Sequence, residues 1–270
     1  GTGLYPAVMY TDNSLSTHTI FRPSDLKPFK SGNKLPIIAW GNGACANSPW
    51  EHVKFLSEVA SHGFLVIAIG PVPEEGKRSE GKTTSSQMID AINWAIEQNN
   101  NKESVFYQKL DITKIAVSGM SCGGLQTIES ASDPRVTTAI VCNSGVLGNN
   151  GGGLPGMPAL TKDYLQKFHT PVLYILGGEK DIAYKNGMDD FSRINDLYGN
   201  QTGKILLMET AKCIADSCRS GDIPARTGEN EFTILSPDTG EKGARELAER
   251  IRLKVAGNRV VTPDGELSVT

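Results

Sequence analysis

The chain has 270 residues, which is enough for one large α/β domain or two small ones. Hydrophobic residues make up 39% and charged residues 21%, and a formal net charge of −3 gives no general attraction to nucleic acid or to an anionic membrane surface. No apolar run approaches the roughly 20 residues that a membrane-spanning helix needs. We therefore expect neither nucleic acid nor membrane among the partners.

The first two thirds of the chain alternate apolar runs with helical patterns. Continuous apolar runs that predict buried strands cover residues 35–40, 64–69, 115–117, 138–142 and 172–176. Apolar residues at helical spacing cover 50–61 and 85–98, and a further helix is expected from residue 126. Strands that are apolar on both faces and alternate with helices predict an α/β fold, with a mostly parallel sheet covered by helices on both faces.

The pattern changes after about residue 195. Amphipathic helices are expected over 204–218 and 241–255, and short strands over 223–226, 232–236, 260–262 and 267–269. The turn residues 227–231 between two of these strands predict a hairpin. We expect residues 1–195 to form one domain and residues 196–270 to form a distinct C-terminal segment.

A serine with glycines on both sides follows the strand at 115–117. The sequence Gly119-x-Ser121-x-Gly123 between a strand and a helix is typical of a nucleophile elbow, in which a tight turn exposes the serine hydroxyl. Such a serine needs hydrogen-bond donors for the oxyanion. The backbone N–H of Cys122 is one candidate, and the N–H of Asn42, in a glycine-containing loop after the first strand of the core, is the other.

A serine nucleophile also needs a base and an orienting carboxylate. Asp181 follows the strand at 172–176, where the acid stands in the chain order Ser, Asp, His, although a solvated loop aspartate is the plainer alternative. Of the four histidines, His52 opens the helix after the Asn42 loop and is the candidate base, with an ordinary surface histidine as the alternative. His18, His62 and His169 are expected away from the serine.

The five cysteines match no zinc-binding spacing, so we expect no metal. Cys45 and Cys122 belong to segments that should meet at the site. They would form a disulfide if the protein is exported, and would be two small buried thiols otherwise.

Residues 4–195 resemble the α/β-hydrolase fold, and within it secreted esterases related to dienelactone hydrolases, cutinase-like enzymes and polyester hydrolases. The matching segments are 38–45, 60–68, 119–124 and 177–183. The resemblance implies Ser121 as nucleophile, Asp181 as acid, oxyanion donors at Cys122 and near Asn42, no cofactor, and a small-molecule or polymeric ester as substrate. It also implies a secreted or periplasmic protein. That family continues into a last strand and a loop with the catalytic histidine, which this chain lacks.

From about residue 190 the chain instead resembles the second half of a GGDEF-type diguanylate cyclase domain. The matching segments are 191–199, 220–235 and 244–251. Asn230 stands where that family has a metal-binding acid, Gly187 stands at the other metal position, and Lys204 replaces an aspartate used for guanine. Because asparagine and glycine lack the anionic oxygens that Mg²⁺ prefers, we do not expect cyclase activity.

These resemblances predict how the two parts combine. The strand at 232–236 and the helix at 241–255 are expected to supply the last strand and the closing helix of the hydrolase sheet, and exchange of this segment between two copies would give a homodimer. The function expected is a serine carboxylic-ester hydrolase, acting on simple, aromatic or polyester substrates and weakened by the missing histidine. The alternatives are a ligand-binding hydrolase relative without catalysis and a nucleotide-binding GGDEF-derived module.

Overall fold

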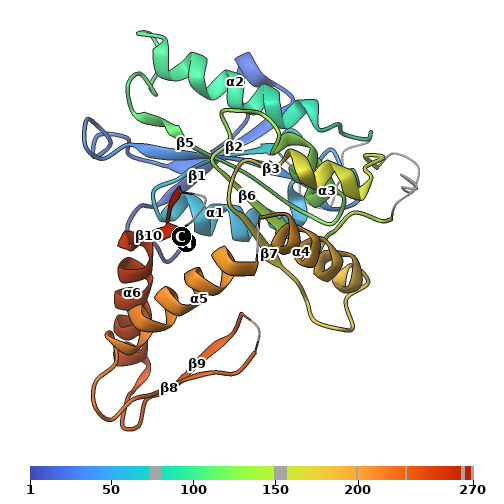
Figure 1. Cartoon of the computed structure of the whole chain (residues 1–270). Helices are drawn as coiled ribbons and strands as arrows, with labels where there is room; N and C mark the ends of the chain where they lie inside the picture. Colours follow the sequence, from blue (N-terminus) through green and yellow to red (C-terminus); the bar gives the residue numbers. More distant parts are fainter. Residues whose placement is uncertain (73–80, 149–156, 199, 229, 263–264, 269–270) are drawn as a thin grey trace. The chain divides into compact units, whose positions relative to one another are not determined.

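The computed structural model describes residues 1–72, 81–148, 157–198, 200–228, 230–262 and 265–268. It divides into two compact units, Gly1–Arg193 and Ile194–Thr270 (Figure 1). The division falls inside helix α4, which spans Tyr184–Tyr198. None of the helices in the described part of the chain combines the length and the apolar composition that crossing a bilayer requires.

The first unit is built on a seven-stranded sheet in the order β1-β2-β4-β3-β5-β6-β7. Its strands are β1 (Ala7–Tyr10), β2 (His18–Pro23), β3 (Leu35–Gly41), β4 (Leu65–Ile69), β5 (Leu110–Met120), β6 (Thr138–Cys142) and β7 (Val172–Ile175). Strands β3 to β7 run parallel, and β1 and β2 add an antiparallel edge. The predicted mostly parallel sheet is confirmed, and the two antiparallel strands are elements that the sequence patterns did not reveal.

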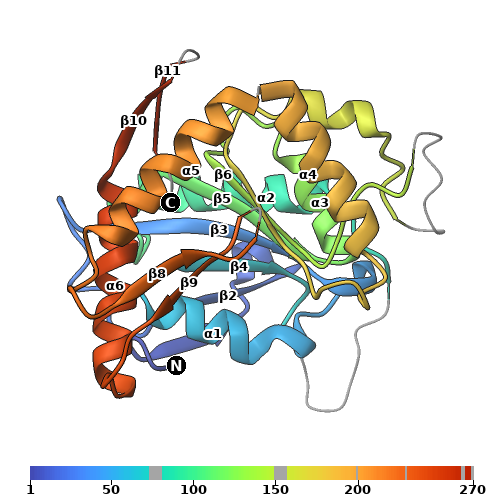
Figure 2. The ribbon, with the colours of Figure 1, turned by 60° about the horizontal axis from the view of Figure 1, so that its bottom comes forward.

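Helices cover both faces of this sheet (Figures 1 and 2). Helix α1 (Val53–Ser61) lies on one face, whereas α2 (Ser86–Asn100) and α3 (Cys122–Ser130) lie on the other. Short 3₁₀ turns precede or join these elements, at Asn13–Leu15, Gly43–Cys45, Trp50–His52 and Lys162–Lys167. Every residue of β4 is buried, as expected for a strand with apolar contacts on both faces. The architecture is compatible with an α/β-hydrolase-like fold.

Apolar side chains fill the space between α1 and the sheet. This core cluster consists of Phe21, Trp40, Leu56, Ala60, Val66 and Ala68. The side chains come from β2, β3, β4 and α1, so they fix the end of β3, from which the loop containing Asn42 leaves the sheet. The candidate site therefore begins on a rigid part of the fold.

In the described residues of the second unit, the end of α4 is followed by two further helices and two antiparallel strand pairs. The helices are α5 (Asn200–Ala215) and α6 (Glu241–Gly257). Strands β8 (Ile223–Arg226) and β9 (Phe232–Leu235) form one antiparallel pair, and β10 (Arg259–Thr262) and β11 (Gly265–Ser268) form another. The predicted hairpin at 223–236 and the helix beginning at 241 are confirmed.

The expectation that residues 232–236 complete the hydrolase sheet is not confirmed. In the described residues β9 pairs with β8 in a two-stranded sheet of its own, and the larger sheet contains β1 to β7. A five-residue connection makes the pairing of β9 with β8 local, which costs little loop-closure entropy.

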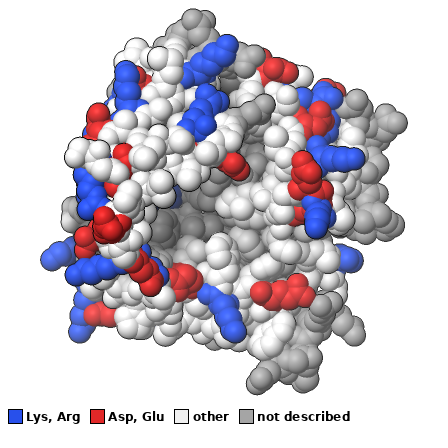
Figure 3. All heavy atoms as spheres, turned by 90° about the horizontal axis from the view of Figure 1, so that it is seen from below, with Lys and Arg blue, Asp and Glu red and all other residues white. Residues whose placement is uncertain are grey.

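On the face drawn in Figure 3, the basic and acidic side chains of the described residues are interspersed and do not gather into a broad patch of one sign. This agrees with a chain in which 27 basic residues nearly balance 30 acidic ones.

Candidate active site

Ser121 lies at a sharp turn between β5 and α3. Its φ of 54° and ψ of −116° are strained for a residue with a side chain, as expected at a nucleophile elbow. Its N–H donates to the carbonyl of Cys142 at 3.0 Å, and its carbonyl accepts bonds from Gly124 N at 2.9 Å and Ser144 Oγ at 2.7 Å. The Ser121 hydroxyl has no hydrogen-bond partner among the described residues. The predicted strand–turn–helix bend is thus present.

The glycines beside Ser121 are required by close backbone packing. A Cβ on Gly119 would collide with the carbonyl of Gly123. A Cβ on Gly123 would collide with the carbonyl of Gly41 and would lie 2.8 Å from the backbone nitrogen of Asn42. The turn that carries the serine and the loop after β3 are therefore in direct backbone contact, as the sequence pattern predicts for a nucleophile and its oxyanion loop.

The side chain of Asn42 anchors the loop after β3. Asn42 is buried, and its Nδ2 donates to the carbonyl of Ala46 at 2.9 Å and to the carbonyl of Ile69 at 2.6 Å. Because both partners are carbonyls, the amide orientation is fixed, and Oδ1 points into a small pocket. The backbone N–H groups of Asn42 and Cys122 donate to no acceptor among the described residues, so each can serve a ligand.

A disulfide joins the two halves of the site. Cys45, at the end of the turn Gly43–Cys45, is bonded to Cys122, the first residue of α3, with 5.2 Å between their Cα atoms. The bond ties the loop after β3 to the residue that follows the nucleophile. Of the two alternatives left open by the sequence, the disulfide is confirmed and the pair of free buried thiols is wrong.

Asp181 lies in the loop between β7 and α4. Its Oδ1 accepts a hydrogen bond from the N–H of Ala183 at 2.8 Å, and its own N–H donates to the carbonyl of Gly178 at 2.9 Å. A Cβ on Gly177 would lie 2.8 Å from its Oδ2, so this oxygen lies beside the chain that leaves β7. The carboxylate therefore binds a backbone N–H just before the start of α4. No histidine of the described residues hydrogen-bonds to it. Its catalytic role stays a prediction.

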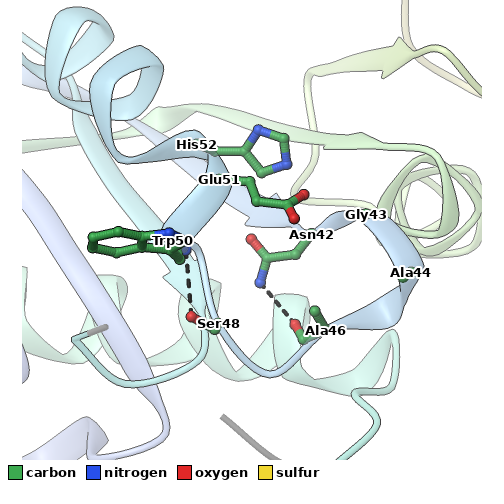
Figure 4. A pocket seen from close by; sticks show the side chains of 8 residues that line it. All are labelled: Asn42, Gly43, Ala44, Ala46, Ser48, Trp50, Glu51 and His52. Carbon is green, nitrogen blue, oxygen red and sulfur yellow. Dashed lines mark hydrogen bonds between the residues drawn. The ribbon is translucent and has the colours of Figure 1, made fainter. Parts of the chain in front are cut away.

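His52 lies beside the loop of Asn42 (Figure 4). It is half-buried, packs edge-on against the Trp40 ring with 5.1 Å between ring centres, and has a buried Nε2 without a partner among the described residues. Burial lowers the pKa of His52, so the ring is neutral at neutral pH. His52 and Asn42 line a cavity of about 50 Å³ that Ser121 does not line. The structure brings His52 to the predicted oxyanion loop but describes no contact with the serine hydroxyl.

The other three histidines have partners elsewhere. His18 is buried in β2, and its two ring nitrogens bond to the hydroxyl of Thr17 and the carbonyl of Gln87, both at 2.9 Å. His62 ends α1 and bonds to Glu58 at 3.0 Å. His169 is exposed and interacts electrostatically with Asp133, beyond the far end of α3. In the described residues none of these three histidines bonds to Ser121, in line with their expected place away from the serine.

A buried ion pair near the site was missed by the sequence patterns. Lys162 and Asp190, both in the first unit, are buried with 2.5 Å between Nζ and Oδ1. Asp190 stands three residues after Gly187 and four before Ile194, which is the spacing of the inward face of a helix. An acidic residue on the inward face of a helix is the signal from which the buried ion pair could have been predicted.

The second unit has a separate groove. A cavity of about 600 Å³ lies between α5 and the β8–β9 hairpin, and its lining is mainly apolar, with Lys204 and Arg226 as its basic residues. Gly187, at the second metal position of the GGDEF resemblance, belongs to the first unit, where a Cβ would lie 2.7 Å from Leu176 Cδ2. In the described residues no three His, Cys, Asp or Glu side chains group as metal ligands.

Comparison with known protein families identifies two matching segments. Residues 23–146 match the family described as PET hydrolase-like, and residues 186–269 match the family described as diguanylate cyclase, GGDEF domain. The PET hydrolase-like match contains Ser121, Asn42, Cys122 and His52, and ends before Asp181. The resemblances found in the sequence are therefore confirmed.

Relatives of the chain are found among diguanylate cyclases. The response regulator PleD of Caulobacter vibrioides is 38% identical over 97 residues, which cover 35% of this chain and 21% of that protein. Diguanylate cyclase A of Treponema denticola is 37% identical over 83 residues, which cover 31% of this chain and 22% of that protein. Diguanylate cyclase DosC of Escherichia coli K12 is 30% identical over 122 residues, which cover 41% of this chain and 25% of that protein. The chain thus spans about a fifth to a quarter of these relatives. In sequence order, it joins a PET hydrolase-like segment to a segment of the GGDEF type.

Proposed function

We propose that the chain is a serine carboxylic-ester hydrolase that forms an acyl-enzyme on Ser121. The observation that carries this proposal is the strained elbow at Ser121, whose turn is in backbone contact with the loop of Asn42. In the described residues, neither the Ser121 hydroxyl nor the backbone N–H groups of Asn42 and Cys122 have a hydrogen-bond partner. The match of residues 23–146 to PET hydrolase-like proteins supports the same reaction class and favours polyester or aromatic ester substrates.

The proposed reaction has two steps. Ser121 Oγ forms a bond to the ester carbonyl carbon while its proton passes to a base, and the carbonyl electron pair moves to an oxyanion that accepts bonds from Asn42 N–H and Cys122 N–H. Collapse of this intermediate breaks the bond to the alcohol oxygen, which leaves with a proton. Water then attacks the acyl-serine in the same way, and releases the acid and the free hydroxyl.

The proton acceptor is the weak part of this proposed site. His52 is neutral and has a free Nε2, which suits a base, and Asp181 follows β7, where an orienting acid belongs. Neither side chain contacts the Ser121 hydroxyl in the described residues. Because loss of a triad member costs ~10⁴ to 10⁶ in rate and leaves the catalysis of the oxyanion hole, we expect slow turnover of activated esters.

The test is covalent labelling of the serine. A fluorophosphonate should add one equivalent to Ser121, located by peptide mass spectrometry, and p-nitrophenyl acetate should be hydrolysed slowly. Ser121→Ala should abolish both, whereas Ser132→Ala, which changes a serine just beyond the other end of α3, should leave both unchanged. Equal ester hydrolysis by the Ser121→Ala variant would show that the serine is not the nucleophile.

Two other functions have specific support. The missing base partner favours a hydrolase relative that only binds ligand, which predicts that the fluorophosphonate does not react. The match of residues 186–269 to the GGDEF family, and the similarity of the chain to proteins named diguanylate cyclases, favour nucleotide binding there. That alternative predicts heat in a calorimetric titration with GTP or cyclic di-GMP in the presence of Mg²⁺. Because Asn230 and Lys204 replace the acids used for metal and guanine, we expect no heat in this titration.

A further inference from the structure

Asp190 is the centre of a buried polar cluster in the first unit. Its exposed fraction is 0%, and its Oδ1 pairs with Lys162 Nζ. Its Oδ2 accepts a hydrogen bond from the N–H of Val146 at 2.8 Å and another from the Tyr174 hydroxyl at 3.2 Å. Burial raises the pKa of Asp190, and the bonds from Lys162 and Val146 act in the opposite direction. The carboxylate thus joins α4, β7, the turn Lys162–Lys167 and the segment after β6.

The segment that Asp190 holds is packed tightly on two sides. A Cβ on Gly145 would lie 2.5 Å from the backbone of Asn186 and Gly187, at the start of α4. On the other side, a Cβ on Gly124 would collide with the side chain of Ser144. Ser144 therefore packs closely against α3, and Gly145 packs closely against α4. Because close-packed segments transmit displacements to their neighbours, a shift of Val146 is expected to shift Gly145 and Ser144 as well.

This segment bonds directly to the nucleophile. Ser144 Oγ donates to the Ser121 carbonyl at 2.7 Å, and the Ser121 N–H donates to Cys142, the last residue of β6. A residue with a φ of 54° keeps that conformation only when its surroundings hold it there. The hydrogen bond from Ser144 is one of these restraints. Ser144 stands two residues before Val146, whose N–H donates to Asp190.

We propose that Asp190 is a positioning residue for Ser121, which it holds through Val146 and Ser144. The expected effect on catalysis rests on the proposed function. The structural restraint on Ser121 does not depend on it. An asparagine at this position cannot satisfy all three donors, because one carboxylate oxygen faces Lys162 while the other accepts two hydrogen bonds. An amide must therefore turn its NH₂ group toward a donor.

The main test compares Asp190→Asn with Asp189→Asn. Asp189 is the neighbouring half-exposed acid, pairs with the same Lys162 at 2.9 Å, and has no bond to Val146. We expect Asp190→Asn to slow the second-order rate of fluorophosphonate labelling of Ser121 by roughly 10 to 100-fold, as small misplacements of a reacting group do. Asp189→Asn should stay within about twofold of the original protein. Each variant is first checked for cooperative unfolding well above the assay temperature.

A double-mutant cycle separates positioning from a general structural effect. If Asp190 acts through Ser144, the labelling rate of Asp190→Asn/Ser144→Ala should be close to that of Ser144→Ala alone, whereas independent effects multiply. Multiplying effects in folded variants, or a normal labelling rate in Asp190→Asn, would overturn the proposal.

Hydrogen exchange tests the positioning without any reaction. Asp190→Asn should speed exchange of the amides at 144–146 and 121–125, while Asp189→Asn should not. If the original protein is not labelled by the fluorophosphonate, the proposed esterase function fails, and this exchange difference alone decides the positioning. Unchanged exchange in a folded Asp190→Asn variant would refute it.

Discussion

Loss of the Cys45–Cys122 disulfide should strongly destabilise the first unit. The bond joins residues separated by 77 positions, and the chain-entropy relation for a loop of that length gives about 15 cal/mol/K, or about 4.5 kcal/mol at 25 °C. We therefore expect Cys45→Ala/Cys122→Ala to lower the free energy of unfolding by about 4 to 5 kcal/mol. Cys142→Ala, which removes a free half-buried thiol in the same unit, measures the packing loss of a sulfur atom without any cross-link.

Urea unfolding followed by tryptophan fluorescence reports on this unit alone. All three tryptophans, Trp40, Trp50 and Trp94, lie in the first unit. Curves for the original protein and the variants are recorded without reductant and compared by midpoint and slope. If the double variant differs from Cys142→Ala by less than about 1 kcal/mol, the cross-link does not restrict the unfolded chain as calculated, and the reasoning is refuted.

Two further predictions concern the turn and the pH dependence. In the same urea assay, Gly119→Ala should lower the free energy of unfolding by more than ~2 kcal/mol, because the new Cβ meets the Gly123 carbonyl. Gly43→Ala should lower it less, because its Cβ first meets the tip of the flexible Met120 side chain. Equal losses in the two variants would contradict this explanation. Burial lowers the pKa of both His18 and His52. Below about pH 6.5 the unfolded chain therefore binds protons that the folded chain does not, and stability should fall as the pH decreases from there. His52→Gln should reduce the loss of stability on acidification, because one of the two buried histidines is removed. If the free energy of unfolding of the original protein does not change between pH 7 and 5, the predicted role of the histidines is wrong.

The features that the sequence predicts well are local. The strands at 35–40, 64–69 and 138–142 form because each is a continuous apolar run, and the hairpin at 223–235 forms because two short strands flank a turn. The bend at Ser121 follows a local pattern, in which Gly119 packs against the carbonyl of Gly123, although Gly123 is also required by its contact with Gly41 on the distant loop after β3. Strands β1 and β2 were missed because they form an antiparallel edge without a long apolar run.

Pairings between distant residues depended on the tertiary structure. The expected addition of residues 232–236 to the hydrolase sheet required a long-range strand pair, and the described chain uses the nearby partner β8. The anchoring of Asn42 by Ile69, 27 residues away, was also not expected.

By itself the sequence determined the alternating strands and helices, the serine at a strand–helix turn, and the similarity of the chain to two families in succession. Only the tertiary structure decided that Lys162 meets Asp190, 28 residues later, and that Asp190 holds Val146, 44 residues earlier. Backbone sterics and apolar periodicity act between neighbours in the chain and leave a readable pattern. The partner of a buried charge is instead set by which helix packs against which strand, and no local pattern records that choice.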